Sequence, residues 1–407
     1  MTIPLTNIGC PPAVLELILY LKSQGIAAYP VGGCVRDALL GIPPHDWDLA
    51  VEAHPQTVMD VCHAQGYSVI PTGLQHGTVT VVTKAGHVEC TACRSEAGYT
   101  DGRHPDAVTF TYQLADDLSR RDFTVNAMAA ELQDNRDFGL VDLFGGRQDL
   151  EKRIIRCVGD PQKRFAEDAL RLLRGVRFCV KLGFDMDEET YDALVATKEG
   201  LTCVSRERVA EELRKILCSP HPSEGISLLT KSQLLPYVFS SGISPCGIGE
   251  LEKLRADFTL RCGCLMWQVP DEILASMLRD LKLSNAEIHA IRTYANPTLP
   301  QGQDRASARR LRHLYGERAQ DVLRVWQCRG GEVDELMANV ELSEALGECV
   351  QIKSLAVDGR VLLSEGFPQG AVLGEILAHL LEVVLEDPAK NQREILIETA
   401  RSWLSSQ

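Results

Sequence analysis

The sequence predicts an α+β protein, in which a mixed sheet with helices precedes a long all-helical remainder. Up to about residue 115, short strand-like runs alternate with turns. From residue 160 onward, nearly every segment carries apolar residues at the helical spacing i, i+3, i+4, i+7. The chain has 407 residues, which exceeds one ordinary core, so we expect three or four units of about 100–150 residues.

The first part of the chain begins with a helix and a buried strand. Pro11 and Pro12 precede AVLELILYLKSQG, a pattern typical of a helix that starts on proline and ends at Gly25. The apolar run IAAYPV follows as a strand. Further strand-like runs, with one helical segment (PQTVMDVCHAQG) among them, are DWDLAVE, YSVIPT, TVTVVT, HVECTAC and VTFTYQ. We expect the next segment, DLSRRDFTVNAMAAEL (117–132), to be helical.

The remainder is predicted to be helical because its apolar residues fall on one face of each segment. The clearest examples are RFAEDALRLLRGVRFCVKLG, EETYDALVATKEG, SRERVAEELRKILCS, EILASMLRDLKL and VLGEILAHLLEVVLED. No fixed-period repeat is present in the sequence.

The composition is that of a soluble globular protein, with 45% hydrophobic and 24% charged residues. No stretch approaches about 18 uncharged apolar residues, and the N-terminus lacks the pattern of a signal peptide. We therefore expect a cytoplasmic protein that does not associate with membranes. Its fourteen cysteines are predicted to be reduced, buried small hydrophobes.

The net charge of −14 has the wrong sign for a protein that coats nucleic acid, but two local windows are basic. Residues 147–181 hold ten Lys or Arg against five acids, and residues 301–330 hold seven Arg against three acids. Such zones in an acidic chain suggest specific anionic contacts. Charge alone leaves open the alternative of solvated helix faces.

A phosphate site is predicted where Gly32 and Gly33 lie between a strand and a helix. Two glycines allow a sharp turn and a close approach of backbone N–H groups to a ligand, and a helix N-terminus suits phosphate. Arg36, one turn into the helix, could contact phosphate oxygens. A plain turn is the commoner meaning of Gly-Gly alone.

A metal site is predicted at Asp46 and Asp48, which flank Trp47. In a strand, residues i and i+2 project from the same face, so the two carboxylates would lie side by side and repel without a cation. Mg²⁺ prefers such oxygen ligands and shares them with substrate phosphates. Glu89, in the strand-like run HVECTAC, is the candidate third carboxylate.

The chain resembles a known protein family in five motifs, which occur in the family's order over about 190 residues. GGCVRDALLG…DWDLA resembles the first signature of the polymerase-β-like nucleotidyltransferases, in the form used by class II CCA-adding enzymes and bacterial poly(A) polymerases. The second to fifth motifs are similar to RRDFTVNAMA (120–129), DLFGGRQDL (142–150), DPQKRFAEDALRLLRGVRF (160–178) and SRERVAEELRKIL (205–217).

The resemblance implies a polymerase-β-like head followed by helical parts, with boundaries that we predict at 1–150 (head), 151–218 (neck), 219–300 (body) and 301–407 (tail). It implies metal binding by Asp46 and Asp48. It assigns nucleotide contacts to the positions Gly33, Arg36, Arg121, Asp168, Arg171, Arg174 and Arg177. Asp122 and Asn126 are further candidates for nucleotide contacts, with capping and bracing of the helix as the alternative, whereas Glu207 and Arg208 are expected to be structural.

The chemistry of Asp168 and Arg171 predicts how a base is chosen without a template. At i, i+3 on a helix the two side chains would be neighbours. A carboxylate accepts hydrogen bonds and a guanidinium donates them, so the couple matches the Watson–Crick edges of cytosine and adenine. Uracil and guanine would turn a carbonyl toward Asp168, at a cost of about 1–3 kcal/mol. An ordinary surface ion pair is the structural alternative.

The resulting expectation is an Mg²⁺-dependent enzyme that adds CCA to the 3′ end of tRNA from CTP and ATP. Residues Tyr99 to Pro105 would supply the flexible loop that the family needs for A addition. CC-adding, A-adding and poly(A)-forming enzymes are the alternatives with the same chemistry. A non-catalytic RNA-binding relative and a small-molecule nucleotidyltransferase are alternatives of another class. A homodimer is left open.

Overall fold

The computed structural model describes residues 3–5, 8–74, 77–97, 107–134, 137–240 and 245–406. Its contacts group the chain into two compact units. Unit 1 comprises Met1–Ile243 with Asp280–Lys282, and unit 2 comprises Ser244–Arg279 with Leu283–Gln407. The finer division into head, neck, body and tail stays a prediction.

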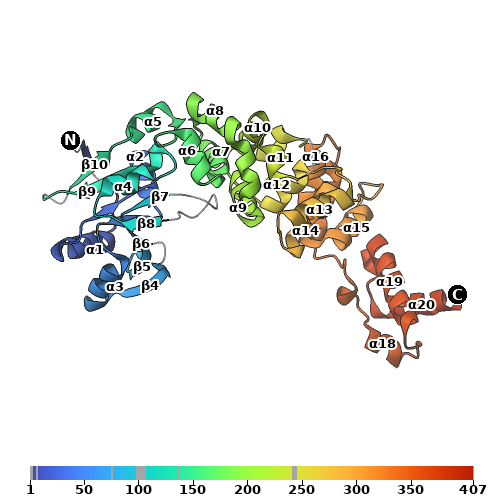
Figure 1. Cartoon of the computed structure of the whole chain (residues 1–407). Helices are drawn as coiled ribbons and strands as arrows, with labels where there is room; N and C mark the ends of the chain where they lie inside the picture. The colour runs from blue at the N-terminus through green and yellow to red at the C-terminus, as the bar shows by residue number, and fades with distance from the viewer. Residues whose placement is uncertain are drawn as a thin grey trace. The chain divides into compact units, whose positions relative to one another are not determined.

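The centre of the head is a five-stranded mixed sheet in the order β2-β3-β6-β5-β4 (Figure 1). Strands β3 and β6 are parallel, and the other neighbours are antiparallel. The predicted strand runs that form this sheet are confirmed to within about two residues at their ends. The strands are β2 (Ala28–Pro30), β3 (Trp47–Val51), β4 (Ser68–Gly73), β5 (Thr78–Thr83) and β6 (Gly86–Ala92).

Helices and two smaller sheets complete the head. A three-stranded antiparallel sheet has the order β1-β10-β9, and β7 pairs with β8. Their bounds are β1 (Ile3–Leu5), β7 (Arg94–Ala97), β8 (Ala107–Phe110), β9 (Met128–Leu132) and β10 (Phe138–Asp142). The helices are α1 (Pro12–Ser23), α2 (Gly33–Leu39), α3 (Pro55–Ala64), α4 (Leu114–Ser119) and α5 (Gly146–Lys152).

The prediction that 117–132 forms a helix is wrong. The segment contains the end of α4, a single 3₁₀ turn at Thr124–Asn126 and the strand β9. Met128, Ala129 and Ala130 are fully buried, and β9 pairs with β10 along its whole length. Pairing in the sheet therefore overrides the helix preference of this alanine-rich sequence.

The rest of unit 1 is helical apart from a small parallel pair, β11 (Ile154–Ile155) with β12 (Asp185–Met186). The predicted helical segment 164–183 does not form one helix. It divides at Asp168, whose backbone is extended with φ −146° and ψ 102°. The helices are α6 (Pro161–Glu167), α7 (Leu170–Leu182), α8 (Glu188–Thr197), α9 (Arg206–Leu217), α10 (Pro222–Lys231) and α11 (Leu235–Val238).

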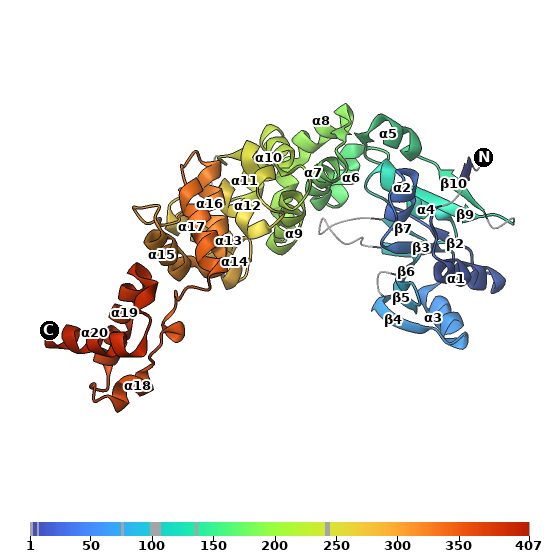
Figure 2. The ribbon, with the colours of Figure 1, turned by 180° about the vertical axis from the view of Figure 1, so that it is seen from behind.

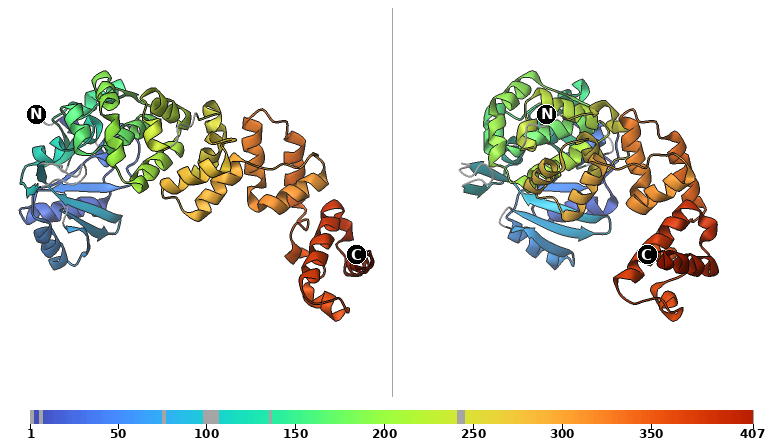
Figure 3. Two further views of the ribbon diagram at one scale, coloured as in Figure 1. Left: turned by 45° about the vertical axis from the view of Figure 1, so that its right-hand side comes forward. Right: turned by 90° about the vertical axis from the view of Figure 1, so that its right-hand side faces the viewer.

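Unit 2 is all-helical in its described part, as predicted (Figure 2). Its helices from residue 305 onward, orange to red in Figure 3, pack around two apolar cores, one containing Leu311 and Leu323 and the other Leu380 and Leu396. The helices are α12 (Phe258–Leu265), α13 (Asp271–Asp280), α14 (Asn285–Ala295), α15 (Arg305–Tyr315), α16 (Ala319–Cys328), α17 (Asp334–Ala345), α18 (Gly359–Ser364), α19 (Ala371–Glu386) and α20 (Arg393–Ser405).

Nine of the fourteen cysteines are buried, as expected of small hydrophobic residues.

Within the described ranges, no helix combines the length and apolar character needed to cross a bilayer.

Candidate active site

One cavity of about 570 Å³ in unit 1 brings head and neck residues together. Eight basic side chains and five carboxylates line it, which makes it electropositive and suited to a polyanion. Nine of the ten predicted site residues line this cavity, and Glu89 is the exception. The lining consists of Gly32, Gly33, Arg36, Asp37, His45, Asp46, Asp48, Arg120, Arg121, Asp122, Asn126, Asp168, Leu170, Arg171, Arg174, Arg177, Phe178, Lys181 and Arg208.

The predicted metal site lies at the start of β3. Asp46 precedes the strand, which begins at Trp47, so the expectation of both aspartates within one strand is wrong. Asp46 is exposed, Asp48 is partly buried, and Trp47 is buried. Asp48 lies directly opposite Glu89 in the parallel register of β3 and β6.

The charge state of Asp48 reflects this crowding of acids. Burial raises the pKa of Asp48 to about 6, and the nearby carboxylates of Glu89 and Asp46 add to the rise while Arg121 opposes it. Among the described residues, no group of three or more His, Cys, Asp or Glu side chains is placed to hold a metal ion. The role of Glu89 as a third metal ligand therefore stays a prediction.

The turn before α2 brings the backbone of Gly32 close to the side chain of Arg121. Gly32 has φ +73°, and a Cβ atom there would lie 2.7 Å from Nη1 of Arg121. Arg36 is buried in the following helix. Its Nη1 donates to Oδ1 of Asn126 at 2.6 Å, and its Nε donates to Oδ1 of Asp37 at 2.8 Å. These contacts hold the guanidinium at the cavity wall.

Asp117, which the sequence reasoning missed, anchors the arginines of the second motif. Its carboxylate is fully buried and accepts hydrogen bonds from Arg120 and from Arg121, the latter at 2.9 Å from Nη2 to Oδ2. Burial alone would raise the pKa of Asp117, but Arg121 and Arg120 outweigh it and lower the pKa below its ordinary value. Asp117 is thus a charged anchor behind the cavity wall.

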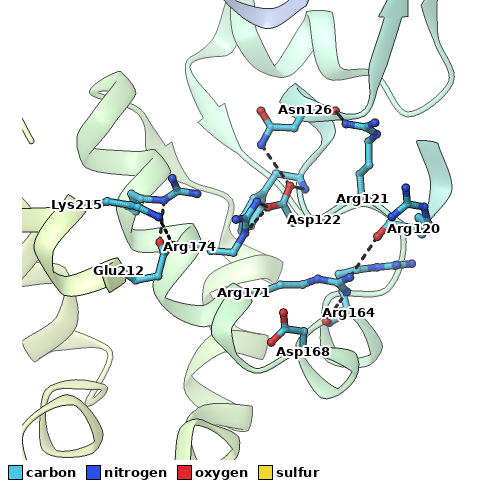
Figure 4. A network of polar contacts seen from close by, with 12 residues as sticks. Arg120, Arg121, Asp122, Asn126, Arg164, Asp168, Arg171, Arg174, Glu212 and Lys215 are labelled. Carbon is cyan, nitrogen blue, oxygen red and sulfur yellow. Dashed lines mark hydrogen bonds and ion pairs between the residues drawn. The ribbon is translucent and has the colours of Figure 1, made fainter. Parts of the chain in front are cut away.

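Asp122 connects the predicted head to α7, a helix of the predicted neck. Its carboxylate accepts a hydrogen bond from Nε of Arg174 at 2.8 Å and another from Nδ2 of Asn126 at 3.3 Å (Figure 4). Burial opposes ionisation, but the pairing with Arg174 lowers the pKa of Asp122 to about 2. Asp122 and Asn126 thus line the cavity and hold its arginines in place, and a direct contact with the nucleotide stays a prediction.

The expected neighbourhood of Asp168 and Arg171 needs a correction. Asp168 lies at the break before α7, not within a helix, and its carboxylate accepts hydrogen bonds from Nη2 of Arg208 and the backbone N–H of Leu170. Arg171 pairs instead with Glu167, at 2.5 Å from Nη1 to Oε2. Both side chains still line the same cavity, each held by its own partner.

Several cavity residues were not assigned from the sequence. Arg208 was expected only to brace the neck, yet it lines the cavity. Phe178 and Lys181 lie on α7, at i+4 from Arg174 and Arg177, so helical spacing from the assigned arginines was the signal that could have found them. The loop predicted at Tyr99 to Pro105 lies outside the described residues.

Comparison with protein families matches three consecutive parts of the chain. Residues 28–156 match the poly A polymerase head domain. Residues 183–244 match a probable RNA and SrmB-binding site of polymerase A, and residues 262–400 match a putative tRNA nucleotidyltransferase domain 2.

Individual relatives match nearly the whole chain. A CCA-adding enzyme of Lactobacillus helveticus is 34% identical, with 94% of each chain covered, and one of Streptococcus pneumoniae is 33% identical, with 94% of this chain and 95% of the relative covered. The solved structure of the Bacillus stearothermophilus CCA-adding enzyme in complex with CTP is 30% identical, with a TM-score of 0.80 over 98% of this chain and all of that one. The chain belongs to the family of CCA-adding enzymes.

Proposed function

We propose that this chain adds C, C and A to the 3′ end of tRNA from CTP and ATP, without a nucleic-acid template and with release of pyrophosphate. The observation that carries the proposal is a single cavity with two different walls. Paired acids at β3 form one wall, and the arginines of α7 with Asp168 form the other. A nucleoside triphosphate carries a polyanion at one end and a base at the other. The acids would bind it through a divalent cation, the arginines would bind its phosphates, and Asp168 with Arg171 would bind its base.

The acids at β3 fit a divalent cation of the Mg²⁺ type. The raised pKa of Asp48 reports carboxylates that are crowded and partly removed from water. A hard divalent cation relieves such crowding and prefers carboxylate oxygens. Asp46 and Asp48 would hold it, with Glu89 as a candidate neighbour. When bound, the cation neutralises charge on the phosphates and favours ionisation of the attacking hydroxyl.

The protein's own residues orient the triphosphate. Arg36, Arg174 and Arg177 present guanidinium groups that neutralise and position phosphate oxygens. The backbone N–H group of Gly33 lies at the start of α2, where the helix dipole favours negative charge. These contacts hold the α-phosphate in line with the attacking 3′-hydroxyl. Most of the rate enhancement then comes from this positioning and from stabilisation of charge in the transition state.

Base selection falls to Asp168 and Arg171. Asp168 accepts from the amino group of cytosine or adenine, and Arg171 donates to the acceptors of the same edge. Arg208 and Glu167 hold these two side chains in the ligand-free protein. Uracil or guanine would bring a carbonyl against Asp168, and this mismatch is the physical basis for their exclusion.

The tRNA is the second substrate in this proposal. A Thermotoga maritima CCA-adding enzyme, 22% identical to this chain, was solved in complex with tRNA, and its TM-score of 0.71 shows a similar fold. We propose that the helical parts bind the tRNA through phosphates and shape. The cytoplasmic location stays a prediction from the sequence, and a homodimer stays an open alternative.

The decisive assay gives the purified chain a tRNA that ends before CCA, with Mg²⁺ and each nucleoside triphosphate alone, then with CTP and ATP together. The proposal predicts two C with CTP alone and CCA with both. Addition of CC only, of A only, or of a long A tract would favour the CC-adding, A-adding or poly(A) alternative. Absence of any incorporation would favour a non-catalytic RNA-binding relative.

A further inference from the structure

The ring of Phe178 contacts three guanidinium groups of the cavity. The Cζ atoms of Arg36 and Arg174 each lie 5.6 Å from the ring centroid, and that of Arg177 lies at 4.4 Å. All three distances are within the range of cation–π attraction. Arg36 comes from α2 in the head and the other two from α7, so one aromatic side chain connects both walls of the cavity.

The ring itself is held firmly. Phe178 is 6% exposed and packs edge to face against Phe123, with centroids 5.7 Å apart and planes at 72°. Gly175 leaves the room for Phe123, because a Cβ atom there would lie 3.3 Å from its ring. The Phe178 ring therefore packs against a buried aromatic side chain as well as against the arginines.

Each of the three guanidiniums also has a carboxylate partner. Asp37 pairs with Arg36 at 2.7 Å, and Glu212 pairs with Arg177 at 2.8 Å. Asp122 pairs with Arg174. Three like charges around one ring would otherwise repel, and burial together with Arg174 and Arg36 already lowers the pKa of Arg177. The ring and the acids together keep the three groups in one place.

We propose that Phe178 is a positioning residue, which fixes the guanidiniums of Arg36, Arg174 and Arg177 before the nucleoside triphosphate binds. This inference rests on the proposed function, because it takes the cavity to be the triphosphate site. Arginine side chains that are ordered in advance lose less conformational entropy on binding. Removing the attraction of the ring should therefore weaken nucleotide binding, even though Phe178 itself need not touch the triphosphate.

The test replaces Phe178 in the full-length chain with mono-, di- and trifluorophenylalanine. Fluorine withdraws electron density from the ring face while the shape changes little, so cation–π attraction weakens stepwise. We expect the Kd for CTP, measured by calorimetry with Mg²⁺, to rise with each fluorine and to reach about tenfold for the trifluoro ring. The KM for CTP should follow the Kd, with kcat on the CCA-less tRNA changed far less.

A matched control uses the same series at Phe165, a ring that is 1% exposed in α6. Fluorination of Phe165 should leave the Kd for CTP constant. The change in melting temperature on fluorination of Phe165 should be no larger than the change on fluorination of Phe178. Phe178→Leu, which removes the ring, should raise the Kd for CTP about tenfold. A Kd that ignores both fluorination and Phe178→Leu would overturn the positioning role.

The outcomes separate this inference from the proposed function. If the wild-type chain adds C and A but the Kd for CTP is the same in all fluorinated Phe178 variants, only the positioning role of Phe178 is contradicted. A wild-type chain that neither binds CTP nor extends tRNA contradicts the proposed function, and the positioning role with it.

Discussion

The Nη2 atom of Arg208 lies 2.9 Å from Oδ2 of Asp168, so the carboxylate proposed to read the base is held by α9 rather than by Arg171. Arg171 has a separate partner in Glu167. The base-reading couple therefore consists of two side chains from one cavity wall with independent supports. Each can be perturbed without dismantling the other.

Arg171→Ala should relax base selection. The alanine removes a guanidinium that donates to N3 of cytosine and that would face the N3–H donor of uracil, while Asp168 and Arg208 stay paired. We expect the preference for CTP over UTP, as a ratio of kcat/KM values, to fall about tenfold. The matched control is Arg147→Ala, which removes an exposed arginine paired with Glu151. A ratio that is unchanged in Arg171→Ala would contradict the pairing scheme.

Asp48→Asn should abolish nucleotide incorporation while it stabilises the ligand-free fold. The pKa of Asp48 is about 6 when folded and about 4 when unfolded, so folding favours the protonated form. Ionisation therefore destabilises the folded state as the pH rises from about 4 to 6. At pH 7 and without divalent cations, we expect a gain of about 1–2 kcal/mol in unfolding free energy.

Denaturant unfolding at several pH values checks this expectation. The gain of Asp48→Asn over wild type should vanish below pH 4, where Asp48 is neutral in both states. Asp46→Ala should also lose incorporation with its fold intact. Unchanged turnover in Asp46→Ala would reject the metal assignment, and a destabilised Asp48→Asn would reject the crowding of acids.

Asp122→Ala should weaken both the fold and the active site. It removes the carboxylate that pairs with Arg174 and leaves this arginine without that partner. We therefore expect a loss of about 2–3 kcal/mol in unfolding free energy. Because pairing lowers the folded pKa of Asp122 to about 2, its stabilisation is present above pH 4 and is lost as the pH falls toward 2. The difference between wild type and Asp122→Ala should therefore shrink below pH 4. A difference that is constant with pH would contradict the ion pair.

Gly32→Ala should lose activity beyond its effect on stability. The alanine must adopt φ +73°, at a cost of about 1–3 kcal/mol, and its Cβ would displace the guanidinium of Arg121. Gly41→Ala is the control, because Gly41 has φ +72° with open space around its Cβ position. Both variants should melt earlier, but only Gly32→Ala should show a raised KM for CTP. Equal KM values in the two variants would contradict the role of Arg121.

The strands of the head were predictable because each apolar run ends at a turn and has period two or a continuous buried stretch. The segment 117–132 was not, since its alanines and methionine favour a helix in isolation and pair with β10 only in the folded sheet. The break at Asp168 was equally hidden, because the residues on both sides of it carry one continuous helical pattern.

The candidate site was predictable where its residues stand close together in the sequence, as Asp46 and Asp48 do. Its supports were not, because they join residues far apart in the chain. Asp122 pairs with Arg174 across 52 positions, and Arg208 with Asp168 across 40. The three arginines around Phe178 come together only when the head packs against α7.

The central claim is that the acids at β3 and the arginines of α7 flank one bound nucleotide. A crystal structure of the chain with CTP and Mn²⁺, whose anomalous signal locates the metal, tests it most directly. We predict metal density between Asp46 and Asp48, phosphates beside Arg36 and Arg174, and the cytosine edge against Asp168 and Arg171. A nucleotide bound elsewhere, or bound here with its metal away from both aspartates, would contradict the account.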